Sequence, residues 1–186
     1  MRFFPAKILL AESRQDYRRI YDKQAPHMRF VADLGVPQPP VFHITAEFVL
    51  NAELRQALRA PEPDLVRVAL LLEAARRDQV RLDPAEAGHA MKNALERMMA
   101  RLQYRSDLNQ LRALNAALEL ARLLPFPVSL WSVQNRYFQM LSQGQLEAPK
   151  DEAEAWQREF AALGERLKIR VPAAEREREP EAPVAA

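Results

Sequence analysis

The residues best suited to bind a ligand lie close together in one segment of the chain. Trp131, Asn135 and Arg136 fall within two helical turns of one another. An aromatic ring beside amide and guanidinium groups is typical of sugar-binding surfaces, because the ring face stacks on C–H groups while the polar groups bond hydroxyls. Core packing is the alternative, since Trp131 and Phe138 are seven residues apart and share one side of a helix. The spacing favours the core, and the sugar-binding interpretation stays open beside it.

The sequence shows no group of residues that predicts catalysis or metal binding. The chain has no cysteine, and its histidines, His27, His43 and His89, belong to no metal-binding motif. His43 and Glu47 are one helical turn apart, but such a pair supplies only two ligands. With 4 glycines, the chain also lacks a glycine-rich phosphate-binding loop. We therefore predict no catalytic residue, no metal site and no cofactor.

Charged residues are numerous and nearly balanced. The chain has 27 basic and 25 acidic residues, and its formal net charge of +2 is too small to indicate nucleic-acid binding. Arginines alternate with acidic residues, which favours ion pairs within helices over a phosphate-binding surface. Three carboxylate pairs fall outside apolar settings, so we predict solvated helix faces for Glu47 and Glu53, Glu152 and Glu154, and Glu175 and Glu177.

No apolar stretch is long enough to cross a membrane. The longest uncharged apolar run lies around Phe126–Val133, where Pro127 and Ser129 interrupt it. A helix that spans a bilayer needs ~20 apolar residues. The N-terminus shows no small-residue cleavage site of a secretory signal. We expect a cytoplasmic protein.

Composition and periodicity predict an all-α fold. Glycine is scarce, and the strong helix formers alanine, leucine, arginine and glutamate dominate. Apolar spacings of three and four, separated by prolines, predict the helices Pro5–Gln24, Pro26–Leu34, Pro40–Arg59, one around Leu65–Leu72, Pro84–Leu102, Leu108–Ala121, Val128–Gln143 and Asp151–Leu167. We predict a bundle of about seven helices over residues 1–171 and a disordered tail over 172–186, where glutamate and arginine alternate.

Several residues predict where helices begin or end. Asp83 is expected to cap the helix that starts at Pro84, with Glu86 at the reciprocal position of a capping box. Ser106 is expected to cap the next helix, and Gly35 suits the left-handed position that follows a helix end. The sequence shows no internal repeat of fixed period.

Three blocks of the sequence resemble one protein family. They are Tyr17–Pro37, Ala46–Arg55 and Leu124–Asn135. The blocks are similar to the C-terminal region of large bacterial proteins whose N-terminal part is a family-57-like glycoside hydrolase barrel (α-amylase/α-mannosidase-like). That C-terminal region is a helical domain of unknown function. The resemblance extends over Ile8–Val171, nearly all of the chain ahead of the predicted tail.

The resemblance implies an accessory role in carbohydrate metabolism. The catalytic barrel of that family lies upstream, so no catalytic residue can be carried over to this chain, which looks like a fragment or a remnant. Helical C-terminal domains of family-57-like enzymes pack against the barrel and can line its cleft. By this analogy Trp131, Asn135 and Arg136 are the candidates for the cleft side. The expected partners are the barrel of a parent protein or a homologous chain, with an oligosaccharide as candidate ligand and with no nucleic acid or membrane.

A second interpretation belongs to another functional class. The chain would be a standalone helical interaction module whose apolar face docks a different protein or a second copy. A surface left bare by a missing barrel would promote self-association, so a homo-oligomer is a further expectation.

Overall fold

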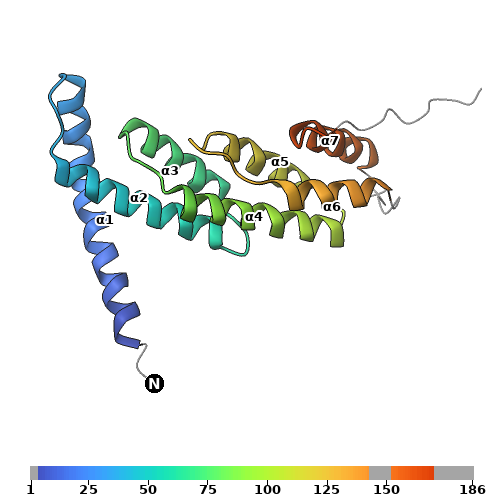
Figure 1. The fold of residues 1–186 in the computed structure, drawn as a ribbon, viewed down its shortest axis with the longest axis horizontal. Helices are drawn as coiled ribbons and strands as arrows, with labels where there is room; N and C mark the ends of the chain where they lie inside the picture. Colours follow the sequence, from blue (N-terminus) through green and yellow to red (C-terminus); the bar gives the residue numbers. More distant parts are fainter. Residues whose placement is uncertain (1–3, 143–151, 170–186) are drawn as a thin grey trace, which may run out of the picture.

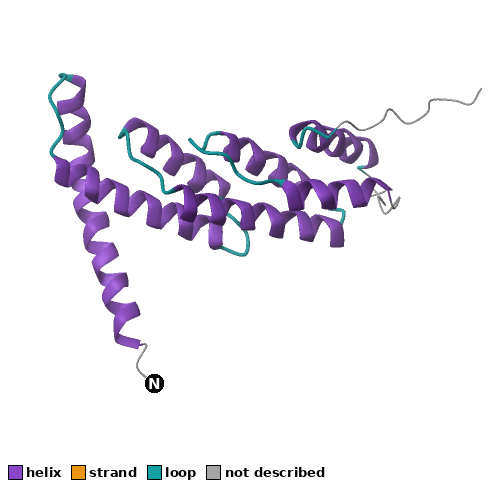
Figure 2. Ribbon diagram, in the orientation of Figure 1, coloured by secondary structure: helices purple, strands orange, loops and turns teal. Residues whose placement is uncertain are grey.

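In the residues that the computed structural model describes, 4–142 and 152–169, the chain folds into helices (Figure 2). Seven helices and no strand are found there, which confirms the predicted all-α bundle of about seven helices. The helices are α1 (Phe4–Asp33), α2 (Pro40–Arg59), α3 (Leu65–Arg77), α4 (Pro84–Tyr104), α5 (Leu108–Arg122), α6 (Trp131–Ser142) and α7 (Ala153–Arg166). The predicted disordered tail, 172–186, lies outside the described residues. Of the helices described, none is both long and apolar enough to cross a bilayer.

The helices stack in two layers (Figure 1). Helices α2, α4 and α6 lie side by side in one layer and α3, α5 and α7 in the other, with α2–α3 and α4–α5 as packed pairs. The helices of the first layer begin at residues 40, 84 and 131, and those of the second layer begin at residues 65, 108 and 153. The intervals are therefore 44 and 47 residues in one layer and 43 and 45 in the other. Stacked helical hairpins of this kind are typical of α-solenoids, and the uneven intervals explain why the sequence shows no fixed period.

The first helix, α1, covers one end of this stack and continues past it. It packs on α2, and its N-terminal turns extend away from the other helices (Figure 1). The sequence predicts a break at Pro26, but Pro26 lies inside α1. A proline inside a helix costs about 3 kcal/mol, because it removes a backbone hydrogen bond and clashes with the preceding turn. Tyr21 and Ala25 are buried before it and Arg29 is bound after it, and these contacts keep the two halves of α1 in line.

Aspartate side chains cap the starts of α4 and α5. Asp83 accepts hydrogen bonds from the first backbone N–H groups of α4, as predicted. The prediction that Ser106 caps α5 is wrong, since Asp107 accepts the N–H bond there. The reciprocal bond expected from Glu86 is replaced by one from Asn51, whose side-chain oxygen accepts the Asp83 N–H at 2.8 Å.

Helix α6 begins at Trp131, three residues later than the predicted start. The residues before it, 125–130, form a non-helical connection from α5. Within it Phe126, Val128 and Leu130 are partly buried against the core, while the residues between them face outward. Alternation of buried and exposed side chains is the pattern of an extended chain. The connection therefore buries apolar side chains without forming a helix.

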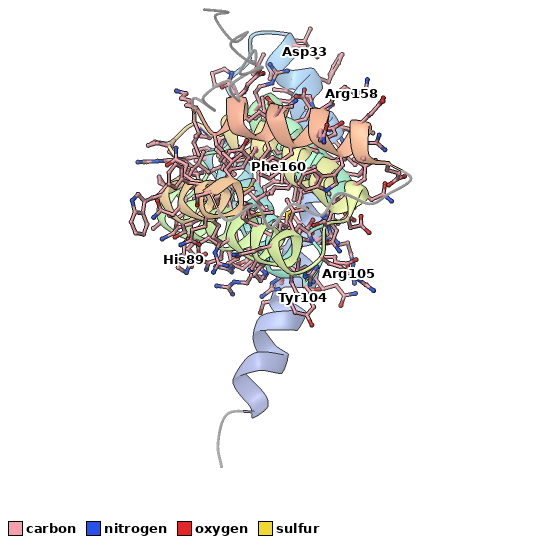
Figure 3. All side chains as sticks on the ribbon, turned by 90° about the vertical axis from the view of Figure 1, so that its right-hand side faces the viewer. Asp33, His89, Tyr104, Arg105, Arg158 and Phe160 are labelled. Carbon is pink, nitrogen blue, oxygen red and sulfur yellow. The ribbon has the colours of Figure 1, made fainter. Side chains whose placement is uncertain are left out.

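Helix α7 packs with the face that the sequence predicts. Trp156, Phe160, Leu163 and Leu167 are all buried. Tyr137 of α6 stacks on Phe160 with 4.5 Å between ring centroids, and its hydroxyl donates to the Phe160 carbonyl at 3.2 Å. Figure 3 shows Phe160 on the inner side of α7. Aromatic packing therefore joins the last two helices.

Gly164→Ala should destabilise the protein, whereas Gly88→Ala should not. A Cβ at Gly164 of α7 would overlap the hydroxyl of Tyr137, and overpacking of this kind costs about 1–3 kcal/mol. A Cβ at Gly88 would lie 3.4 Å from the Phe126 ring, and alanine favours a helix over glycine by about 1 kcal/mol. Urea unfolding of both variants measures the difference. Equal losses of stability would contradict the close approach of α6 and α7.

Candidate functional site

The predicted ligand residues lie at the start of α6. Trp131 is 69 % exposed and Phe138 is 61 % exposed, so the prediction that they pack in the core is wrong. Asn135, one turn after Trp131, is exposed as well. Residues at these spacings share one side of a helix. Trp131, Asn135 and Phe138 therefore form one outward face of α6.

Arg136 does not join this outward face. Its side chain is half-buried and donates to the side-chain oxygen of Gln103 in α4 at 3.1 Å. The neighbouring Gln134 donates to the backbone carbonyl of Leu167 at 2.9 Å and links α6 to the end of α7. Of the three predicted site residues, the structure brings two together and turns Arg136 towards α4.

Large apolar side chains are exposed where α1 crosses α2. The α1–α2 apolar face consists of Tyr17, Ile20, Val41, Ile44 and Phe48, with exposed fractions from 43 % to 66 %. The rings of Tyr17 and Phe48 are in contact, with 5.0 Å between their centroids. Ile20 lies one turn from Tyr17 on α1, and Ile44 lies one turn from Phe48 on α2, so each extends the exposed apolar surface of its own helix. The spacing of Val41, Ile44 and Phe48 is the sequence signal for this face.

Two clefts lie along the edge where α3, α5 and α7 end. The α5–α7 cleft has a volume of about 640 Å³ and lies between the ends of α5 and α7 and the connection 124–130. The α3–α5 cleft, of about 690 Å³, lies between the end of α3 and the end of α5. Pro125 lines both, so the two clefts adjoin. Each falls in the range of roughly 300–1,000 Å³ that small-molecule sites occupy.

The histidines do not assemble into a metal site. Within 4–142 and 152–169, no group of three or more possible metal-ligating side chains comes together. The ring of His27 lies 3.3 Å from the Lys23 carbonyl, and that of His89 lies 2.9 Å from the Asn93 amide. Figure 3 shows His89 at the periphery of the molecule. These local contacts belong to separate helices.

Glu53 differs from the predicted solvated carboxylate. Its side chain is buried in α2, whereas Glu47, its partner in the predicted pair, is exposed. Arg18 of α1 and Arg67 of α3 both form ion pairs with Glu53, the second at 3.3 Å. Glu53 therefore joins three helices. Its partners lie on other helices, so the residues next to Glu53 in the sequence do not indicate these ion pairs.

A second buried carboxylate, Asp78, joins α1 to the end of α3. Arg29 donates to its two oxygens at 2.6 and 2.8 Å, and the Tyr21 hydroxyl donates at 2.5 Å. Burial alone would raise the pKa of the Asp78 carboxyl, but the hydrogen bonds from Arg29 and Tyr21 outweigh it and hold that pKa below its usual value. Burial and the neighbouring carboxylate also raise the pKa of Tyr21. The cluster is therefore a fixed ion pair at neutral pH.

Comparison of the chain with protein-family models, with curated proteins and with solved structures finds no match. The resemblance to the family-57-like glycoside hydrolase proteins therefore stays a prediction from the sequence. Function is therefore inferred from the geometry of the described residues.

Asp78→Ala should lower the free energy of unfolding by about 3 kcal/mol, because Arg29 and the Tyr21 hydroxyl lose their acceptor in a largely buried setting. Asp22→Ala is the matched control, since it removes an exposed partner of Arg18. The control should cost less than about 0.5 kcal/mol. Urea unfolding at pH 7 compares the two variants, and losses of similar size would argue against the anchoring role of Asp78.

The same cluster makes stability depend on pH in acid. Since the folded-state pKa of Asp78 lies below its unfolded value, its contribution is complete above the unfolded pKa of about 3.9 and is lost as pH falls through the folded pKa. The stability difference between the wild type and Asp78→Ala should hold from pH 7 to about pH 5 and shrink below about pH 4. A difference that persists to pH 2 would contradict this linkage.

Proposed function

We propose that this chain is a non-catalytic helical accessory domain that docks the catalytic barrel of a family-57-like glycoside hydrolase. The α1–α2 apolar face is the observation that carries the proposal. A contiguous exposed patch of large apolar side chains marks a surface that binds a partner. The five side chains of this face come from two helices, so a partner on it would contact both.

The two ends of the stack differ in chemistry. Solenoid proteins need a polar outer face on their terminal units to remain separate. Helix α7 has such a face, with the exposed polar residues Glu154, Gln157, Arg158 and Glu165. Figure 3 shows Arg158 on the outer side of α7. The α1 end presents apolar side chains instead, so a partner at that end would continue the packing of the stack.

The resemblance supports a barrel as this partner. In the family-57-like proteins the barrel lies upstream of the helical region. Helix α1 is the first helix of this chain and extends beyond the stack (Figure 1). A barrel that precedes α1 would therefore lie at the α1 end of the stack, on the side to which the N-terminal turns of α1 extend.

The buried carboxylates support an accessory role. Asp78 and Glu53 are each bound by arginine side chains and tie α1 to the stack. A general acid needs a carboxyl group whose pKa is raised towards neutral pH. The pKa of Asp78 is shifted in the opposite direction. This carboxylate is suited to holding helices together.

Val41→Asp and Ile44→Asp should each weaken binding to a purified family-57-like barrel by about 30-fold, because each places a charge in an apolar interface. Both positions are exposed in the free chain, so the fold should survive. Leu70→Asp on α3 is the matched control, because Leu70 is equally exposed but lies outside the α1–α2 apolar face. Calorimetric titration measures the affinity. No binding by the wild type, or equal loss in the control, would refute the docking proposal.

A standalone interaction module is the alternative, and the same face supports it. In that case two copies of the chain would associate through the α1–α2 apolar face. Sedimentation of the chain alone would then show a dimer that Ile44→Asp converts to a monomer. A monomeric wild type that binds the barrel would favour the accessory role.

The outward face of α6 favours a second role, in binding an oligosaccharide. The indole of Trp131 is open to stack on a sugar ring, and the exposed Asn135 amide one turn away can bond hydroxyls. An accessory domain with this face would contribute to substrate binding without taking part in the chemistry.

Trp131→Ala should weaken binding of maltohexaose by about fivefold or more, because the stacking surface is lost. Tyr104→Ala is the matched control, since Tyr104 is also an exposed aromatic residue but belongs to α4 and not to the outward face of α6 (Figure 3). Calorimetric titration of the full chain gives the affinities, and far-ultraviolet circular dichroism checks the fold. Binding that survives Trp131→Ala would exclude this residue from a sugar site.

A further inference from the structure

Three helices end in the same backbone turn, but they do not use the same residue for it. After α1, α3 and α7 the chain passes through a left-handed residue: Gly35 (φ 72°), Gln79 (φ 53°) and Lys168 (φ 56°). The amide that follows bonds back into the last turn, as the Ile169 N–H does to the Gly164 carbonyl at 2.9 Å. Glycine suits this position, whereas a residue with a Cβ is strained there. Strained residues of this kind concentrate at functional sites.

Lys168 lines the α5–α7 cleft. Arg122 at the end of α5 and Arg166 at the end of α7 line it as well, and no described carboxylate does. Glu119, which does not line the cleft, pairs with both guanidinium groups, at 3.2 Å to Arg122 and 2.7 Å to Arg166. One carboxylate thus faces two guanidinium groups, and Lys168 adds a third positive charge.

The α5–α7 cleft keeps a net positive charge. Glu119 offsets one of the three positive charges, which leaves two. The C-terminal ends of α5 and α7 each carry roughly half a negative charge from the helix dipole. The balance is an excess of about one positive charge, which matches a ligand with a single anionic group.

Apart from Gln134, the remaining walls of the cleft are apolar. Leu124, Pro125, Phe126, Val128 and Leu130 supply them from the connection that precedes α6. Apolar walls with a few convergent polar groups are the usual composition of small-molecule sites. Trp131 does not line this cleft, so the site is separate from the outward face of α6 and from the α1–α2 apolar face.

We propose that the α5–α7 cleft binds a medium-chain acyl carboxylate, whose chain lies along residues 124–130 and whose carboxylate meets Lys168 and Arg166. The strained backbone of Lys168 is compatible with this role, because a glycine there would ease the turn but would remove the ammonium group. The proposal goes beyond docking of a barrel and stands independently of it.

Decanoate, used below its micelle-forming concentration, is the probe for calorimetric titration of the full chain. Lys168→Met should weaken decanoate binding by about fivefold, the size expected for one partly exposed ion pair. Lys168→Arg keeps the charge, and Lys92→Met removes a partly exposed lysine of α4 that does not line the cleft, so both should bind within about twofold of the wild type. The neutral analogue 1-decanol should bind more weakly than decanoate, and added salt should weaken decanoate binding.

Lys168→Gly separates a binding role from a structural one. It should raise the melting temperature by about 2–4 °C, since glycine relieves the left-handed strain, while it weakens decanoate binding as much as Lys168→Met does. A variant that gains stability and binds decanoate like the wild type would show that Lys168 serves the turn alone and would overturn the proposal. Absence of decanoate binding, equal binding of 1-decanol, or loss of binding in Ile44→Asp would overturn it as well.

Discussion

The placement of α1 depends on buried carboxylates that bind its arginines, above all on Asp78. Among the side chains of α1 that the structure describes, Tyr21 and Ala25 are buried, which is little apolar contact for a helix of 30 residues. Full burial of a large apolar side chain contributes only about 1.5–3 kcal/mol. At the point where α3 ends, Arg29 donates hydrogen bonds to both carboxylate oxygens of Asp78, and the Tyr21 hydroxyl donates another. The α1–α2 apolar face is built by both helices, so it depends on this cluster, together with the Arg18–Glu53 ion pair, to hold α1 across α2.

The predictable parts of the fold are those whose signals are local. The bounds of α2, the cap at Asp83 and the buried stripe of α7 all follow from residues within a few positions of one another. The buried ion pairs were not predicted, because the two residues of each pair lie far apart along the chain. Arg29 lies 49 residues from Asp78, and the arginines that bind Glu53 lie on α1 and α3. Those contacts are also what makes Pro26 tolerable inside α1.

The candidate site could be predicted in composition but not in orientation. A spacing of seven places Trp131 and Phe138 on one side of a helix but does not show whether that side faces the core or solvent. The deciding pattern lies just before them, where Phe126, Val128 and Leu130 alternate with outward residues. This alternation brings the chain to α6 with Trp131 on the outside. The turn of Arg136 towards Gln103 has no local signal, because its partner is 33 residues away.

The alternating connection before α6 also restricts how the length of this chain can vary. A one-residue insertion or deletion between Pro125 and Trp131 would reverse the direction of the side chains that follow it within the connection, because the side-chain period of an extended segment is two. Leu130 would then face solvent. A two-residue change keeps each side chain on its original side. Relatives of this protein should therefore differ in this connection by even numbers of residues, whereas surface loops without such alternation accept any change of length.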